Sequence, residues 1–191
     1  TLYVLQRTID DLAAWCQHGL VVSAAVNISA KLVYSNEFID KAKRILTETG
    51  IPRNRLIFEV TESATIDDPS AAVAALQHFR DLGIAISMDD YGTGQSTLTY
   101  LKQLPLSELK IDRSFVQHAH EDANDALLVQ STIDLAHRLG LRVVAEGVED
   151  RSCLTFLREA GCDLAQGYFI GRPTSPEEIR EMLTSHTSLA A

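Results

Sequence analysis

Six short apolar runs in this chain each carry one polar side chain at or near their carboxyl end and then pass into a turn. These polar residues recur at intervals of 20 to 36 residues, and segments with helix-like spacing lie between them. Such a rhythm is typical of βα units in a parallel sheet. Because the carboxyl ends of barrel strands converge on one face, polar residues there indicate a catalytic site. The six residues are Asn27, Glu59, Asp89, Lys110, Glu146 and Gln166.

Strand-like and helix-like segments alternate along the whole chain. Helices are expected to end at glycines, and Asp68 followed by Pro69 is the pattern of an N-cap residue and a first helical position. Strands are predicted over 25–29, 57–62, 86–90, 109–113, 143–149 and 164–169. Helices are predicted over 2–16, 37–49, 68–83, 122–138, 151–160 and from Pro176 onward.

No low-complexity segment or long linker interrupts this alternation, so we predict one domain spanning residues 1–191. The expected fold is α/β, a (β/α)8 TIM-like barrel. A closed eight-stranded barrel with its outer helices usually needs about 250 residues, whereas this chain has 191 residues and opens on a helix. We therefore expect an incomplete barrel that lacks its first strands.

The composition limits the classes of partner. The formal net charge is −9 and lysines and arginines form no cluster, which argues against binding to duplex nucleic acid. No apolar stretch approaches the roughly 20 residues that span a membrane, so we expect no membrane contact by this domain. Neither a signal-peptide pattern nor a CxxC spacing is visible. Cys16, Cys153 and Cys162 have apolar neighbours, which predicts buried reduced thiols and a cytoplasmic domain, with or without a membrane-anchored remainder.

Asp89 and Asp90 form the sharpest local signal, because two adjacent carboxylates end the apolar run GIAISM. One of them can bridge two metal ions while its neighbour binds the second. A simple Asp-containing turn is the alternative interpretation. Polar residues at three other strand ends, Glu59, Glu146 and Asn27, favour the metal site. Oxygen ligands favour Mg²⁺ or Mn²⁺, and zinc is not expected because the histidines all lie outside the predicted strands.

Lys110 and Glu62 each have two interpretations. An ammonium group in the buried run ELKID needs counter-charges, so Lys110 either activates a water and stabilises developing charge or bridges carboxylates structurally. The inward carboxylate of Glu59 needs a cation or strong hydrogen bonds for the same reason. Glu62 lies past its strand, where it either anchors the neighbouring loop 90–94 or is a solvated or helix-capping acid.

Six ordered blocks of sequence resemble the EAL domain, the bacterial cyclic-di-GMP phosphodiesterase module. The resemblance implies a barrel that hydrolyses cyclic-di-GMP to linear pGpG with two metal ions. The residues matching Asn27, Glu59 and Asp89 hold one ion, and those matching Asp89, Asp90 and Glu146 hold or support the second. The blocks are AVNIS, FEVTES, MDDYGTG, LKIDRSF, AEGVE and AQGYFIGRP, which together cover essentially the whole chain.

The same resemblance implies roles for residues outside the ligand set. Lys110 matches the residue that contacts the nucleophilic water, and Gln166 matches one near that water and the substrate phosphate. Glu62 matches a glutamate that anchors the loop after the paired aspartates. Three further residues match positions near the bound nucleotide: Asp112, Arg172 and Pro173.

Two departures from the family pattern affect the expected activity. The Glu-Ala-Leu stretch is absent from this sequence, together with the strand that carries it in the family. That strand supplies a metal ligand and a nearby arginine, so we expect this chain to be weakly active or inactive. Tyr91 stands where phenylalanine is usual, and Gln95 and Thr97 also depart from the pattern, but none of these changes removes a ligand.

The main alternative function is a non-catalytic cyclic-di-GMP sensor or protein-interaction module. Degenerate EAL domains of that class usually lose ligands, whereas every visible ligand position here is filled. An unrelated metal-dependent barrel, such as an aldolase or enolase-like enzyme, is the third interpretation. Because an incomplete barrel exposes strand edges and apolar faces, we also expect a homodimer or another form of self-association.

Overall fold

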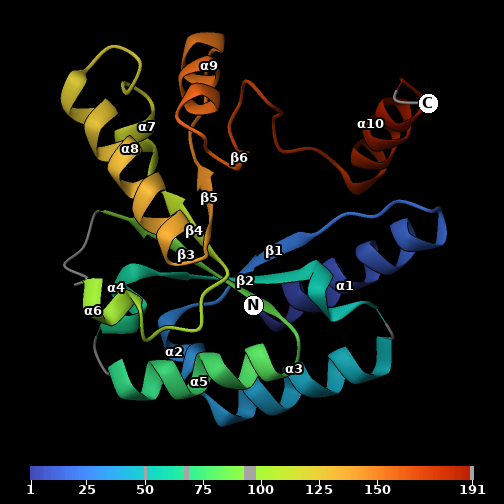
Figure 1. Ribbon diagram of the computed structural model, residues 1–191. Helices are drawn as coiled ribbons and strands as arrows, with labels where there is room; N and C mark the ends of the chain where they lie inside the picture. The colour runs from blue at the N-terminus through green and yellow to red at the C-terminus, as the bar shows by residue number, and fades with distance from the viewer. Residues whose placement is uncertain (50, 67–68, 93–97, 190–191) are drawn as a thin grey trace.

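The computed structural model describes residues 1–49, 51–66, 69–92 and 98–189, which form a parallel sheet with helices packed against it (Figure 1). Within these residues the sheet has six strands in chain order, each parallel to the next. The sheet curls without closing, so the α/β fold of an incomplete TIM-like barrel is confirmed. The strands are β1 Ala24–Asn27, β2 Leu56–Thr61, β3 Ala85–Tyr91, β4 Glu108–Ile111, β5 Arg142–Ala145 and β6 Leu164–Ala165.

Long helices follow β1, β2, β4 and β5 and cover the outer face of the sheet. In Figure 1, α3 and α5 lie below β2 and β3, whereas α8 and α9 stand beside β4 and β5. The long helices are α1 Leu2–Gln17, α3 Asn36–Thr49, α5 Pro69–Asp81, α8 Ala123–Arg138, α9 Arg151–Glu159 and α10 Pro176–Leu189. The single-turn helices are α2 Ala30–Val33, α4 Glu62–Ile66, α6 Leu98–Leu101 and α7 Arg113–Val116, with a 3-10 turn at Arg53–Arg55.

The long helices agree with the sequence prediction, whereas the single-turn helices were not predicted. One turn contains too few residues to show a 3.6-residue period, so the sequence pattern does not reveal it. The predicted N-cap Asp68 and the residues Gln95 and Thr97 lie outside the described residues. None of the described helices is long and apolar enough to cross a membrane.

Alternation along β2 separates the core from the site. Phe58 packs edge-to-face on Phe79 of α5, with ring centroids 5.0 Å apart, and both rings are fully buried on the outer face. A pair of this geometry contributes about 0.5–1.5 kcal/mol beyond the area it buries. Glu59 follows Phe58 and therefore points to the inner face, where it lines a cavity and meets Lys110 of β4.

The cysteine prediction is correct for one residue and wrong for another. Cys153 is buried, Cys162 is half-buried and Cys16 is exposed. Leu5, Ile9 and Leu12 precede Cys16 on the same stripe of α1 and are buried. The last turn of α1 extends past this packing, so Cys16 lines an open cavity of about 300 Å³ at the helix end and solvent reaches it.

The two edge strands bound an opening in the curled sheet. Among the described residues, β1 pairs only with β2, and the two-residue strand β6 pairs only with β5. A cavity of about 760 Å³ lies between these edges, against the inner face of the sheet. Helix α10 follows a long connection after β6 (Figure 1), and its residues Ile179, Met182 and Leu183 line that cavity.

Candidate functional site

Lys110 lies at the centre of a buried group of carboxylates. Its ammonium nitrogen Nζ is 3.0 Å from Glu59 Oε1, 2.9 Å from Asp89 Oδ1 and 2.5 Å from Glu146 Oε1. Lys110 is 3% exposed and Glu59 is 8% exposed, so water screens these contacts little. The four residues come from β2, β3, β4 and the end of β5, four neighbouring strands of the sheet. The structure therefore brings these sequence-predicted residues into direct contact.

Asp89 and Asp90 lie near the carboxyl end of β3, at an irregular point of the sheet. The β3–β4 register shifts between Met88 and Tyr91, and Asp90 has φ of 58°, a left-handed conformation that residues other than glycine rarely adopt. The Asp90 N–H donates to Asp89 Oδ1 at 3.2 Å. Carboxylate oxygens of Asp89, Asp90 and Glu146 all lie within 4.8 Å of one another, and such a group can hold a metal ion. We call Glu59, Asp89, Asp90, Lys110 and Glu146 the acidic cluster.

Burial and like charges work against ionisation of the acidic cluster. Desolvation and the charge of Asp89 raise the pKa of Asp90 above its ordinary value. Desolvation likewise raises the pKa of Glu146, with Asp89 and Glu59 adding repulsion against the attraction of Lys110. Burial by itself lowers the pKa of Lys110, but hydrogen bonds and charges of Glu146, Glu59 and Asp89 outweigh it, so the pKa is raised. Lys110 is therefore charged at neutral pH, and the carboxylates around it remain in excess.

Glu62 opens α4 directly after β2 and is 2% exposed, which rules out a solvated acid at this position. Its Oε2 accepts a hydrogen bond from the Gly92 N–H at 3.3 Å. After burial, the charge of Glu62 is the second cause that raises the pKa of Tyr91. Glu62 thus contacts the backbone two residues beyond Asp90.

Asn27 and Gln166 lie at the carboxyl ends of the edge strands and are exposed. Asn27 is the register partner of Glu59, so the two side chains share the inner face. The Gln166 N–H continues the β5–β6 ladder by donating to Ala145 O at 2.8 Å. Five of the sequence-predicted residues line the cavity of about 760 Å³: Glu59, Lys110, Gln166, Arg172 and Pro173.

Two of the residues predicted near the nucleotide have partners within the chain. Asp112 is the N-cap of α7 and accepts hydrogen bonds from the Ser114 N–H at 2.9 Å and the Ser114 hydroxyl at 2.5 Å. Desolvation alone would raise the pKa of Asp112, but these hydrogen bonds outweigh it and lower the pKa. The Arg172 guanidinium lies 4.6 Å from the centroid of the Tyr168 ring, a cation–π contact that restricts its orientation.

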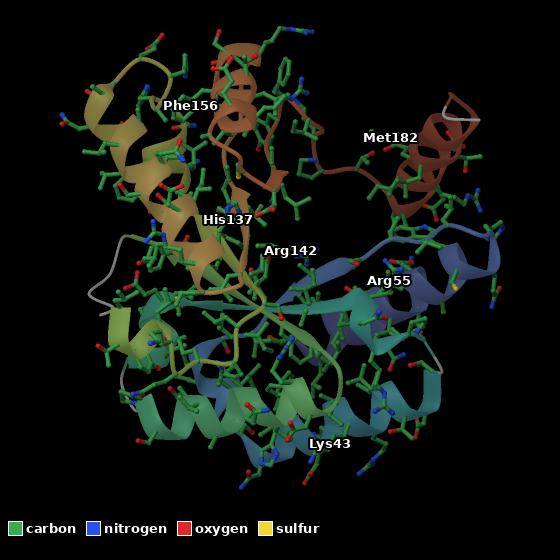
Figure 2. All side chains as sticks on the ribbon, in the orientation of Figure 1. Lys43, Arg55, His137, Arg142, Phe156 and Met182 are labelled. Atoms are coloured by element: carbon green, nitrogen blue, oxygen red, sulfur yellow. The ribbon has the colours of Figure 1, made fainter. Side chains whose placement is uncertain are left out.

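A second polar layer lies one step below Lys110 on the inner face and was not predicted. Glu108 is 4% exposed, and its Oε2 lies 3.1 Å from Arg142 Nη2. Ser87, the register partner of Glu108, is fully buried. Arg142 is labelled in Figure 2, as is Met182 of α10, and both line the cavity. The spacing of Glu108 and Lys110 by two residues carried this signal, because alternate residues of a strand share a face.

Comparison with protein families gives a match over most of the chain. The family model of the EAL domain matches residues 1–173. Among curated proteins, the chain is similar to the bifunctional diguanylate cyclase/cyclic di-GMP phosphodiesterase MucR of Pseudomonas aeruginosa, with 38% identity over 178 residues, 93% of this chain and 26% of MucR. It is also similar to the cyclic di-GMP phosphodiesterase NbdA of the same species, with 37% identity over 99% of this chain and 24% of NbdA. The chain thus spans about a quarter of these relatives.

Solved structures show the same fold. The chain is similar to a MucR phosphodiesterase in complex with c-di-GMP, with a TM-score of 0.89 and 37% identity over 93% of this chain and 72% of that chain. It is similar to the EAL domain of Mycobacterium smegmatis DcpA, with a TM-score of 0.90 and 32% identity over 96% of this chain and 83% of that chain. The curled sheet and its helices are therefore shared with known domains of this kind.

Proposed function

Because the chain belongs to the EAL domain family, we propose that the domain it forms hydrolyses cyclic-di-GMP. The proposed product is linear pGpG, and the proposed context is bacterial second-messenger signalling in the cytoplasm. We propose that residues 1–191 belong to one domain and that two Mg²⁺ or Mn²⁺ ions are required. MucR and NbdA, which are more than 35% identical to this chain, and the MucR phosphodiesterase structure, which shares its fold, support this assignment.

The acidic cluster is the observation that carries the proposal. Its four carboxylates offer only oxygen atoms as metal ligands, and those of Asp89, Asp90 and Glu146 lie within 4.8 Å of one another. Desolvation and like charges raise the pKa of Asp90 and of Glu146, so these carboxylates lack enough positive charge nearby. The residues present therefore fit divalent cations of the hard, oxygen-binding class. When bound, such ions lower the pKa of an attacking water and stabilise charge on the entering and leaving oxygens.

The residues of the site have two kinds of role, as ligands of the metal ions and as a source of positive charge. Asn27, Glu59 and Asp89 are the proposed ligands of one ion, and Asp89, Asp90 and Glu146 are those of the other. Lys110 holds Glu59, Asp89 and Glu146 in place through three contacts of 3.0 Å or less. Because its raised pKa keeps it protonated, Lys110 also offers a positive charge where negative charge develops during phosphoester cleavage.

The cavity beside the acidic cluster has a size that suits a nucleotide. Its volume of about 760 Å³ lies within the usual range of ligand pockets, roughly 300–1,000 Å³. Gln166 supplies an amide at the end of β6, next to the strand end that carries Glu146. Three residues are proposed to contact the nucleotide: Asp112, Arg172 and Pro173.

We propose that this chain by itself turns over cyclic-di-GMP slowly and that it self-associates. Asn27, a proposed ligand, lies at an exposed edge strand, where the described residues supply no neighbour on one side. A ligand in that position is less rigidly held than one in the centre of the sheet, and catalysis depends on geometry fixed to a fraction of an ångström.

A metal-dependent turnover assay tests the proposal. The chain is incubated with cyclic-di-GMP after chelation and then with Mg²⁺, Mn²⁺ or Ca²⁺, and pGpG is quantified by chromatography. We expect turnover with Mg²⁺ and Mn²⁺, and loss of turnover after chelation and with Ca²⁺, which tolerates looser coordination. Equal turnover after exhaustive chelation would contradict the metal requirement.

Two isosteric substitutions and a control identify the site. Asp89→Asn and Glu59→Gln remove one charge each from the acidic cluster and should lower turnover at least about a hundredfold, a loss typical of an electrostatic catalytic group. Asp10→Asn on the exposed surface of α1 should leave turnover unchanged. Binding measured in parallel by calorimetry separates the alternative, since a sensor would bind cyclic-di-GMP without cleaving it under any metal condition.

A further inference from the structure

We infer that Tyr34 and Tyr100 are positioning residues that act through Glu62 on the backbone immediately after Asp89 and Asp90. This inference rests on the proposed function, because it concerns the same site. The two tyrosines lie outside the acidic cluster and hold the single-turn helix α4 in place.

Helix α4 is too short to hold its own geometry. It has five residues, Glu62–Ile66, and isolated helices shorter than about 12 residues are marginal in water. The last four carbonyl groups of any helix have no partner within it, and Ala64 and Thr65 belong to that last turn. Contacts from other elements must therefore fix α4, and with it the carboxylate of Glu62.

Two tyrosine hydroxyls supply such contacts at adjacent carbonyls of α4. The Tyr34 hydroxyl donates to Ala64 O at 2.9 Å. The Tyr100 hydroxyl donates to Thr65 O. Both tyrosines are half-buried, so water competes weakly for these carbonyls.

The two tyrosines come from different sides of the site. Tyr34 is the C-cap of α2, which follows β1 and Asn27. Tyr100 belongs to α6, which follows β3 along the chain and lies beside α4 in Figure 1. The tyrosine pair therefore ties the segments after β1 and β3 to the segment after β2, at the end of the sheet where the acidic cluster lies.

Glu62 transmits the position of α4 to the paired aspartates. Its Oε2 accepts the hydrogen bond from Gly92, whose other side faces the Phe115 ring closely enough that an added Cβ would lie 3.0 Å from Cε2. Asp90 precedes this point by two residues and has φ of 58°. A non-glycine residue persists in that conformation only when the surrounding structure fixes it. Loosening α4 should therefore loosen Gly92 and release Asp90.

Amide hydrogen exchange at Gly92 tests the inference without any assumption about activity. The variants are Tyr34→Phe, Tyr100→Phe and the double variant, which keep the rings and remove only the hydroxyls. Tyr3→Phe, at a position 81% exposed on α1, is the matched control. We expect Gly92 exchange to accelerate about fivefold in each single variant and about twentyfold in the double variant, as expected for a typical hydrogen bond. The control should show no change.

A double-mutant cycle tests whether the tyrosines act through Glu62. Glu62→Met removes the acceptor and keeps a side chain of similar volume. In that background the tyrosine substitutions should not accelerate Gly92 exchange further, because the hydrogen bond between Glu62 and the Gly92 N–H is already absent. Full additivity in the cycle would overturn the inference. Equal acceleration at Ile133 of the distant helix α8 would also overturn it, because the tyrosines would then stabilise the whole fold.

Measuring kcat and KM for cyclic-di-GMP with the same variants tests whether the tyrosines affect turnover. If the wild type turns over cyclic-di-GMP, the tyrosine variants should lower kcat about as much as they accelerate Gly92 exchange, with KM changing less than twofold. A change confined to KM would overturn the positioning role. If the wild type shows no turnover, the proposal that this chain by itself turns over cyclic-di-GMP fails, whereas the exchange measurements still decide whether the tyrosines hold Gly92. If the double variant does not fold, the two single variants decide the outcome.

Discussion

The central strands and the edge strands of this sheet hold their polar residues in different ways. Lys110 on β4 is 3% exposed and Glu59 on β2 is 8% exposed. The Lys110 Nζ atom lies 3.0 Å from Glu59 Oε1. Asn27 on β1 and Gln166 after β6 also lie at carboxyl strand ends, yet both are exposed. Equivalent positions in the repeat thus differ because a central strand has neighbours on both sides and an edge strand has one.

This difference separates the factors that place a side chain at the site from those that restrict its conformation there. Strand direction and alternation place a side chain at the correct end and on the correct face, whether the strand is central or at an edge. Burial and ion pairing require a second neighbour, and only those contacts restrict the side chain to one geometry. Ion pairs therefore restrict the side chains at the centre of the sheet, whereas each edge strand lacks a second neighbouring strand among the described residues.

The substitution with the largest expected effect compares the stability contributed by a central-strand residue with that contributed by an edge-strand residue. Lys110→Met should lower the free energy of unfolding by about 3–5 kcal/mol, because it leaves Glu59, Asp89 and Glu146 buried without their counter-charge. Gln166→Ala at the edge should change it by less than about 0.5 kcal/mol. Urea denaturation in the presence of a chelator measures both. Added Mg²⁺ should restore part of the stability of Lys110→Met, and a loss as small as that of Gln166→Ala would refute the comparison.

The next largest effect on stability is expected at Gly147, which lies beside the acidic cluster and close to Arg113. Gly147 follows Glu146 with φ of 71°, and a Cβ there would lie 2.4 Å from Arg113 Cβ. Gly147→Ala should therefore lower the free energy of unfolding by about 2–4 kcal/mol through backbone strain and overpacking, and should lower turnover by displacing Glu146.

The matched control for this clash is Gly140→Ala at the end of α8. Gly140 has φ of 75°, but an added Cβ meets no atom of the described residues within 4 Å. This variant should therefore show only the conformational effect, about 1 kcal/mol. Thermal unfolding of both variants gives the comparison, and equal losses would show that the contact with Arg113 is unimportant.

Self-association should depend on the outward backbone groups of β1. The Ile28 N–H donates to Glu59 O on β2, so alternation directs the Ala25 N–H to the open edge. Ala25→Pro should weaken self-association about fivefold, the effect of about one hydrogen bond, with little change in folding. Sedimentation at several concentrations measures it. Ala24→Pro, whose N–H faces β2, should instead destabilise the fold, and unaltered association of Ala25→Pro would exclude this edge.

The smallest effect concerns the edge strand β6, whose start is held by Asp163. Its Oδ2 accepts from the Val143 N–H and lies 2.8 Å from both that nitrogen and His137 Nε2. Desolvation alone would raise the pKa of Asp163, but the His137 and Val143 contacts outweigh it and lower the pKa. The carboxylate therefore stabilises the fold at pH values above its unfolded-state pKa, and this contribution disappears as the pH falls through the lower folded-state value.

Asp163→Asn should accordingly lower the free energy of unfolding at pH 7 by less than about 1 kcal/mol, since the side chain is partly exposed and solvent screens its charge. The difference from the wild type should shrink as the pH falls below the ordinary Asp pKa of 3.8 and vanish below the lower folded-state pKa. Urea denaturation from pH 7 down to pH 3 measures this. A difference that grows toward acid pH would contradict the sign of the pKa shift.

The sequence by itself determined the order of the elements and the end of the sheet that carries the site. Apolar alternation in β2 identified Glu59 as inward, an assignment that depends only on the period of two in a strand. The long helices were likewise readable from their period. The single-turn helices were not, so two interpretations of Glu62 stayed open from the sequence, and the contact of its carboxylate with the Gly92 N–H became visible only with α4 in the structure.

Only the tertiary structure decided which of these residues are buried and what they contact. It gave Lys110 three carboxylate partners, placed Asp90 at φ of 58°, added the layer of Glu108 and Arg142, and left Cys16 exposed at the end of an otherwise buried stripe. The physical reason is that periodicity is a property of neighbours along the chain, whereas burial and ion pairing depend on segments far apart in sequence.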